Sequence, residues 1–119
     1  MVSDNSIKTE SKECKMKGPG YCPRPLEVAN SFLSKKWTIS IIVTIGNFNK
    51  LRFNGIMGRI EGITAKTLTE RLKELKGLGL LKRTIYNEIP PRVEYELTSK
   101  GKKLMKAIIP LIEWSMDKK

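Results

Sequence analysis

Positive side chains on one segment carry the strongest chemical signal in this sequence. Residues 65–78 predict an amphipathic helix, since apolar side chains share one face when successive residues turn by about 100°. These apolar residues are Ala65, Leu68, Leu72 and Leu75, and the opposite side carries Lys66, Thr67, Glu70, Lys73 and Glu74, with Arg71 on its flank. Lysine and arginine can bind phosphates or guanine edges, threonine a base methyl group or a phosphate, and glutamate a cytosine. The alternative is a solvated helix face whose charges pair at (i, i+4) spacing.

A second basic group stands beside a pair of prolines. Arg92 follows Pro90-Pro91 in a loop that we expect to join two strands. A guanidinium at the tip of such a loop can enter a minor groove or hold a phosphate. The alternative is a surface arginine that pairs with Glu88 or Glu94. The two segments together predict a DNA-binding set that consists of Thr64, Ala65, Lys66, Thr67, Glu70, Arg71 and Arg92.

Catalytic and metal chemistry have little support in the sequence. The chain has no histidine, so it lacks the usual general base and the usual nitrogen ligand of zinc. Its two cysteines, Cys14 and Cys22, cannot complete a four-ligand zinc site. The loops GxxxxGK[ST] and GxGxxG, which bind nucleotide phosphates, do not occur. We therefore expect no enzymatic activity, no catalytic residue, no metal and no cofactor.

The charge balance of the whole chain also favours a polyanionic partner. The 23 lysines and arginines exceed the 12 acidic residues and leave a formal net charge of +11. Such an excess on a small chain is typical of nucleic-acid binding. A non-specific coating or architectural protein would need only this charge. The positive charge is spread along the chain, whereas the candidate base-reading residues are confined to one helix and one loop, which favours a sequence-specific regulator.

The length and the hydropathy pattern predict one domain with a short arm. A chain of 119 residues with 39% hydrophobic residues suits a single modest core. Residues 1–21 are polar and predict a flexible arm, and residues 22–119 predict the folded domain. The N-terminus lacks the apolar region of a signal peptide, and no apolar run is long enough for a transmembrane helix. We expect a cytoplasmic protein with no membrane partner.

Two elements are predicted in the first half of the domain. A proline-punctuated start near Cys22 leads into a short amphipathic helix, and Ser34 is a possible cap for the element that follows it. That element, residues 37–45, is rich in β-branched residues that alternate as in a strand. Ile41, Ile42 and Ile45 suit a helix equally well, so local pattern leaves both alternatives open.

The second half of the domain has clearer signals. Residues 53–60 have helical spacing, although Gly55 and Gly58 weaken it, and Thr64 is a good N-cap for the helix at 65–78. Gly79 suits a left-handed cap with Leu80 folded back onto the helix end. Residues 81–86 and 92–98 predict a β-hairpin. A final helix follows, with Thr98 or Ser99 as its cap and a bend at Pro110.

Three helices followed by a hairpin is the order of a winged helix-turn-helix domain, in which residues 65–78 are the recognition helix. The predicted fold class is therefore mainly α with a small β-hairpin, with extra helices at the N- and C-terminal ends. These extra helices present more apolar surface than one small core needs, which predicts a symmetric homodimer. The expected dimer residues are Leu26, Ala29, Phe32, Leu33, Leu104, Ile108, Leu111 and Ile112.

Several short motifs occur in one order along residues 22–114. They are Cys22-Pro23, Lys35-Lys36-Trp37-Thr38, Arg52-Phe53-Asn54, Gly62-Ile63-Thr64, the run from Leu68 to Leu75, Gly79-Leu80, the run from Pro90 to Thr98, Gly101 and Trp114. In this arrangement the chain resembles HxlR-type transcriptional regulators, although Gly55-Ile56 replaces the usual Glu-Leu. The resemblance implies a dimeric winged-helix regulator that binds near-palindromic promoter sites, and it implies a helix at residues 37–45.

The resemblance also gives Cys22 a possible role as a thiol sensor. Some members of the family use a cysteine at the matching Cys-Pro position to sense oxidants or electrophiles, and a neighbouring cation such as Arg24 would promote this reactivity. The alternative is a small buried apolar residue at a helix start. A disulfide between Cys14 and Cys22 is geometrically allowed but is unnecessary in a reducing cytoplasm. The expected effector is an oxidant or a small ligand.

Overall fold

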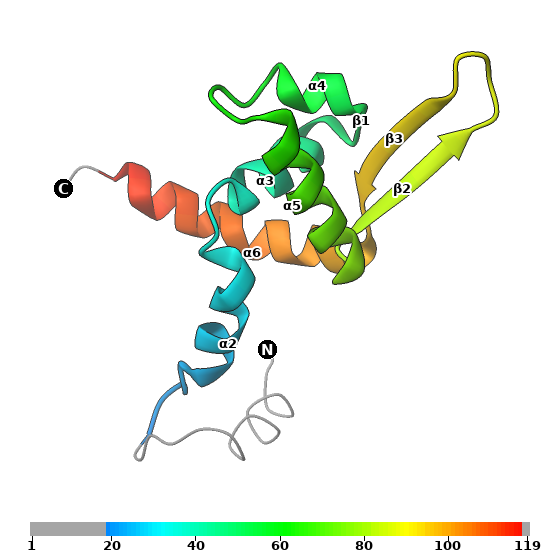
Figure 1. Cartoon of the computed structure of the whole chain (residues 1–119). Coiled ribbons are helices and arrows are strands. Elements are labelled where there is room, and N and C mark those ends of the chain that lie inside the picture. The colour runs from blue at the N-terminus through cyan, green and yellow to red at the C-terminus, as the bar shows by residue number, and fades with distance from the viewer. Residues whose placement is uncertain (1–18, 118–119) are drawn as a thin grey trace. The chain divides into compact units, whose positions relative to one another are not determined.

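The computed structural model describes residues 19–117, which divide between two compact units, Met1–Lys36 and Trp37–Lys119 (Figure 1). The domain boundary predicted at residue 22 falls inside the first unit. Most of the predicted arm, residues 1–21, lies outside the described part of the chain. Within that described part, no helix combines the length and the apolar character needed to cross a membrane.

The described part of the first unit contains one helix, α2 (Arg24–Leu33). Pro23 is its N-cap and Pro25 lies in its first turn, where a missing N–H costs little. Ser34 is its C-cap, and both the Ser34 amide (3.0 Å) and its hydroxyl (2.6 Å) donate to the Asn30 carbonyl. The prediction that Ser34 begins the next element is therefore wrong: its hydroxyl satisfies a carbonyl at the end of α2.

The second unit begins with α3 (Thr38–Phe48), which resolves the ambiguous segment as a helix. Ile41, Ile42 and Ile45 share one face of α3 and are fully buried. Burial of these side chains in the core overrides the local β propensity, because propensity is worth little beside the removal of three isoleucines from water. Trp37 is the N-cap, with a left-handed φ of 81°.

A short strand and a short helix follow, β1 (Lys50–Leu51) and α4 (Phe53–Met57). The helix predicted over residues 53–60 is thus shorter than expected and has Gly58 as its C-cap. A Cβ at Gly55 would lie 3.2 Å from Cδ2 of Leu51, so the glycine lets α4 lie close to β1.

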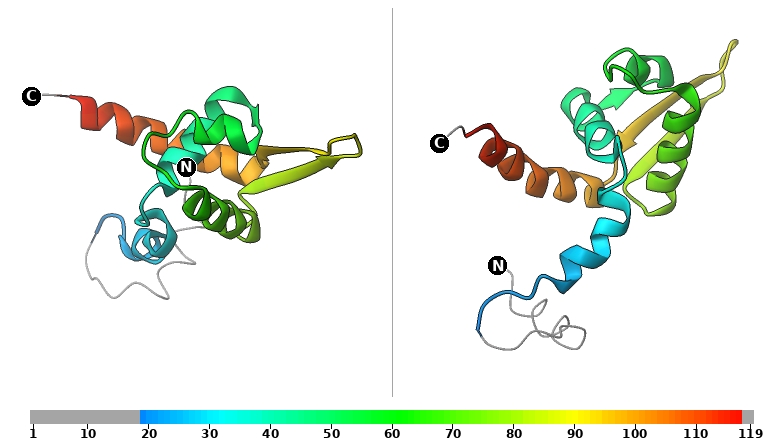
Figure 2. Two further views of the ribbon diagram at one scale, coloured as in Figure 1. Left: turned by 45° about the horizontal axis from the view of Figure 1, so that its top comes forward. Right: turned by 60° about the vertical axis from the view of Figure 1, so that its left-hand side comes forward.

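Strands β2 (Leu81–Tyr86) and β3 (Arg92–Leu97) form the predicted hairpin. They pair antiparallel with Arg83 opposite Tyr95, and β1 pairs with the other side of β3, where Lys50 lies opposite Glu96. The sheet order is therefore β1-β3-β2, and the third strand is an addition to the expected hairpin. The far end of the hairpin projects beyond the helices of this unit in both views of Figure 2.

The remaining helices are α5 (Ala65–Gly77) and α6 (Ser99–Met116), which continues through Pro110. Gly79 has a φ of 80°, and the Leu80 amide donates to the Leu75 carbonyl at 3.0 Å, which confirms the expected left-handed cap of α5. Leu68, Leu72 and Leu75 are buried as predicted, whereas Ala65 is exposed. The first turn of a helix lies at the edge of the core, so its apolar residue gains little burial.

Direct polar contacts join the end of α5 to the start of α6. The Thr98 amide donates to the Leu80 carbonyl at 3.0 Å, and the Thr98 hydroxyl donates to the Gly79 carbonyl at 2.6 Å. The Lys100 ammonium reaches the Leu78 carbonyl at 3.2 Å. The same Thr98 oxygen accepts from the Gly101 amide at 3.1 Å, so Thr98 is the N-cap of α6. These bonds satisfy carbonyls that the end of α5 would otherwise leave unpaired.

Candidate nucleic-acid interface

The start of α5 is held by its own cap. The Thr64 oxygen accepts a hydrogen bond from the Thr67 amide at 3.1 Å, and the Thr64 hydroxyl lies 3.0 Å from that of Thr67. Leu68 and Leu72 anchor the next turn in the core. The N-terminal half of α5 is therefore a rigid element whose outer face is set by buried side chains on its inner face.

The predicted DNA-binding residues of α5 separate into two groups by exposure. Thr64, Ala65, Lys66 and Glu70 are exposed on the outer face, whereas Thr67 and Arg71 are half-buried. The Thr67 hydroxyl is engaged with the cap and Arg71 has an interaction partner within the protein, so both are more constrained than expected.

One further residue belongs to this outer face but was absent from the sequence prediction. Thr69 is exposed and lies one turn after Lys66. The (i, i+3) spacing places the two side chains on neighbouring positions of the helix surface. Helical spacing alone could have identified Thr69, because its hydroxyl can contact bases or phosphates as the Thr67 hydroxyl can.

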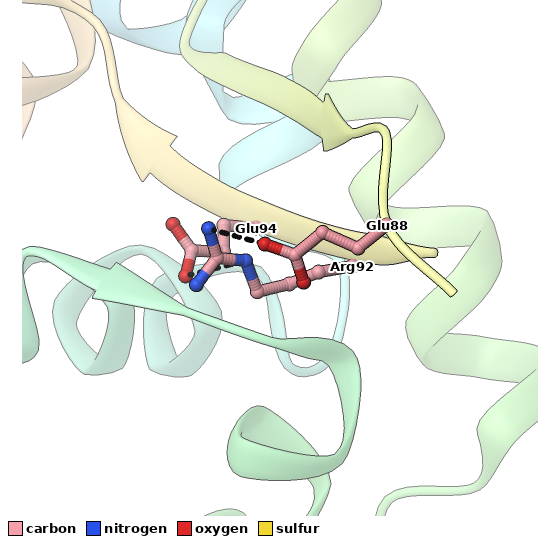
Figure 3. A network of polar contacts seen from close by, with 3 residues as sticks. All are labelled: Glu88, Arg92 and Glu94. Atoms are coloured by element: carbon pink, nitrogen blue, oxygen red, sulfur yellow. Dashed lines mark ion pairs between the residues drawn. The ribbon is translucent and has the colours of Figure 1, made fainter. Parts of the chain in front are cut away.

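Arg92 contacts the wing, the β2–β3 hairpin, in several ways (Figure 3). Its guanidinium carbon lies 4.0 Å from the centre of the Tyr86 ring, and Nη2 lies 3.2 Å from Oε2 of Glu88. Nε lies 3.9 Å from Oε2 of Glu94. The structure therefore contains the alternative arrangement, in which Arg92 forms ion pairs with Glu88 and Glu94. Arg92 is the first residue of β3, while Ile89 at the tip of the loop is fully exposed.

These contacts predict that Arg92 braces the wing. Arg92→Ala should raise amide hydrogen exchange in residues 85–92 by about fivefold, because a partly exposed cation–π contact is worth about 1 kcal/mol. Lys82→Ala, which removes an exposed cation from the same hairpin, is the matched control and should leave exchange unchanged. Equal exchange in both variants and the parent would show that the stack and ion pairs do not order the wing.

The residues predicted to form a dimer differ in their availability. On α2, Leu26 is 65% exposed, and Ala29, Phe32 and Leu33 are half-buried. On α6, Leu104 and Ile112 are half-buried and Leu111 is exposed.

Ile108 is only 5% exposed, so its assignment to a dimer surface is corrected. Its side chain is already buried in the core of its own chain and has little apolar surface left for a partner. The sequence prediction missed Trp114 and Met116 on α6, which are 73% and 65% exposed.

Cys22 is disulfide-bonded in the structure. Cys22 is therefore not a free thiol in this state. Cys14, the other cysteine of the sequence, lies outside the described residues. A disulfide at the start of α2 is consistent with thiol chemistry at this position.

A short helix, a second helix capped by Thr64 and a hairpin beside it define the second unit as a winged helix-turn-helix domain, the class that inserts its second helix into the DNA major groove. The model of the HxlR-like helix-turn-helix family matches residues 32–119. The chain belongs to this family of transcriptional regulators, as its motifs predicted.

Relatives and solved structures agree with this assignment. The chain is 44% identical over 89 residues to an uncharacterized HTH-type transcriptional regulator of Methanothermobacter thermautotrophicus. The aligned residues make up 75% of this chain and 67% of the relative. A MarR-family transcriptional regulator structure from Porphyromonas gingivalis has a TM-score of 0.75 and 33% identity, over 88% of this chain and all of that one. Reduced YodB from Bacillus subtilis has a TM-score of 0.67 and 34% identity, over 81% and 92% of the two chains. The redox regulator HypR in its oxidized form has a TM-score of 0.70 and 32% identity, over 76% and 92%.

Proposed function

We propose that this chain is a homodimeric regulator that binds near-palindromic promoter sites through α5 and the wing. The observation that carries the proposal is the outer face of α5, where Lys66 and Glu70 are exposed while buried leucines fix the helix from the other side. A rigid helix with exposed hydrogen-bonding groups can read base edges in the major groove. Since chromosomal DNA is the partner, we expect the protein to work in the cytoplasm.

The wing contributes mainly to positioning in this proposal. Arg92 is held by Tyr86 and Glu88, so it orders the hairpin against the DNA backbone more than it reads bases. The net charge of +11 adds sequence-independent attraction to phosphates. Specificity then resides in α5, and the background affinity resides in the distributed lysines and arginines.

A titration of promoter fragments against unrelated DNA at several salt concentrations tests the proposal. Both affinities should fall steeply as salt rises, because each neutralised phosphate releases counterions. At physiological salt the operator should remain bound at least about 1,000-fold more tightly than unrelated DNA. Equal affinity for all sequences would replace the regulator by a non-specific coating protein.

The homodimer is supported by the exposed apolar residues of α6 and α2. Leu111, Trp114 and Leu26 are each more than half exposed, and exposed apolar surface of this kind commonly marks an interface. Sedimentation at micromolar concentration should give twice the mass of the chain. Trp114→Lys should shift the protein towards monomer and weaken operator binding, whereas a monomeric parent with full operator affinity would contradict the dimer.

The proposed signal is an oxidant that acts through Cys22. Its support is the disulfide at this residue and the similarity to HypR, which is described as a redox regulator. Reduction with dithiothreitol should change the operator affinity of the parent. Cys22→Ser should have the same affinity with and without the reductant. A parent that does not respond to reductant would remove Cys22 from the mechanism and leave the DNA-binding proposal intact.

A further inference from the structure

The sulfur of Met105 lies at a close approach of α6 to α3, two helices that pack against each other. A Cβ added at Gly46 of α3 would overlap this sulfur and would lie 3.0 Å from Cδ1 of Leu97. Glycine at position 46 therefore leaves the thioether in direct contact with the backbone of α3. Because no spare volume remains on this side of the sulfur, the two helices can keep their spacing only while the group between them stays small.

Met105 also lines a cavity of about 180 Å³ at the surface of the second unit. Asn49 and Lys102, which belong to the same lining, are exposed, so the cavity is reached from solvent. A water molecule takes up about 30 Å³ in the liquid, so a space of this size admits a small polar oxidant such as hydrogen peroxide. Met105 is therefore accessible to such an oxidant although its side chain is half-buried.

Two lysines give this cavity hydrogen-bond donors. Lys102 and Lys106 lie three residues before and one residue after Met105, and both line the cavity. A thioether sulfur is only a weak acceptor, whereas the oxygen of a sulfoxide is a polar group that a lysine ammonium can bind. Oxidation of Met105 would therefore favour a side-chain position towards the lysines and away from Gly46.

From this arrangement we infer that Met105 is a modification site, whose oxidation by hydrogen peroxide to the sulfoxide loosens the contact between α3 and α6. The sulfur attacks one oxygen of the peroxide, the O–O bond breaks, and the second oxygen leaves with both hydrogens as water. The sulfur is oxidised and the peroxide is reduced. The product is larger and more polar than the thioether, so it does not fit between Gly46 and Leu97.

The same oxidation should weaken DNA binding, and this consequence rests on the proposed function. The first turn of α6 is bonded to the end of α5, where the Thr98 amide donates to the Leu80 carbonyl. A shift of α6 away from α3 is therefore passed on to α5. Met105 lies in the second unit and Cys22 in the first, so the two sulfur atoms can be tested separately.

Peroxide treatment of the full chain with Cys14→Ser and Cys22→Ser tests the site, because the thioethers are then its reactive sulfur groups. Peptide mass spectrometry should find the sulfoxide at Met105, formed at most about tenfold more slowly than at Met116, which is 65% exposed. The thermal unfolding midpoint should fall by about 5 °C or more. Methionine sulfoxide reductases with dithiothreitol should restore it, since they return the thioether and release water. An unmodified Met105, or a sulfoxide at Met105 with an unchanged midpoint, would overturn the inference.

Two further substitutions in this cysteine-free chain localise the effect. Met105→Leu keeps an apolar side chain of similar volume and removes the sulfur, so peroxide should no longer lower the midpoint. Met116→Leu removes an exposed sulfur from the end of α6 and should leave the sensitivity to peroxide unchanged. An equal fall of the midpoint with and without Met105→Leu would assign the effect to another methionine and overturn the site.

Operator binding by the treated chain tests the link to DNA. Its affinity should fall by at least about threefold, and Met105→Leu should prevent this fall. A lowered midpoint with unchanged operator affinity would overturn the coupling to DNA and leave the modification site standing. An untreated chain that binds no promoter fragment more tightly than unrelated DNA would overturn the proposed function, while the mass spectra and the midpoints still decide the site.

Discussion

Gly101→Ala should destabilise the second unit by about 3 kcal/mol, near the upper end of the usual cost of overpacking. Gly101 is buried in the first turn of α6, and a Cβ there would overlap the carbonyl oxygen of Leu80. That oxygen accepts the Thr98 amide, so it cannot move without breaking the junction between α5 and α6. Urea denaturation should show a lower midpoint with an unchanged slope.

Gly77→Ala is the matched control for this prediction. Gly77 is exposed in the last turn of α5, and a Cβ there would meet nothing within 4 Å. The substitution should stabilise the protein by about 0.5 kcal/mol, because alanine has the better helix propensity. A similar loss in both variants would show that the close approach to Leu80 does not matter.

Arg71→Ala should reduce operator affinity by about 10- to 100-fold and relax the preference at particular base pairs, as expected for loss of a base contact worth 1–3 kcal/mol. Arg71 is half-buried at the edge of the outer face of α5, so part of its side chain is already ordered before DNA arrives. The measurement is a binding-site selection with the variant and the parent, together with a thermal unfolding curve for each.

Lys103→Ala removes the same charge from an exposed position on α6 and is the control for Arg71→Ala. It should change affinity by less than about threefold and leave the selected consensus intact, because a distant exposed charge is screened by salt. An unchanged consensus with Arg71→Ala would remove this residue from base reading and leave Lys66 and Thr69 as the candidates.

Elements with strong local signals were predictable from the sequence. The start of α5 at Ala65, its left-handed cap at Gly79 and the strand at residues 81–86 all match, because capping residues and turn residues act within a few positions of the chain. The helix at residues 38–48 could be predicted only from the family resemblance. Its β-branched residues favour a strand, whereas the burial of its isoleucines in the core is achieved by a helix. Strand β1 is too short to form a pattern and exists only through its pairing with β3.

Prediction of the candidate site was limited by side-chain contacts. The types of residues on α5 were predictable, but the engagement of Thr67 by Thr64 and of Arg92 by Tyr86 depends on rotamers that the sequence does not reveal. Residues of α4, α5, β2 and β3 also line a cavity beside the wing, and such a combination has no local signature in the sequence. Folding brings together Arg83 and Lys73, which have no visible relation in the sequence.

The hydrogen bonds between Leu78, Gly79 and Leu80 on one side and Thr98 and Lys100 on the other have a mechanical consequence. They join the C-terminal end of α5 and the first turn of α6 into one rigid junction. The distal half of α6 carries the exposed Leu111 and Trp114. A rotation of α6 that starts there should therefore move α5 as well. We therefore expect that a second copy of the chain, if it rotates α6 on binding, also reorients α5, the proposed recognition helix.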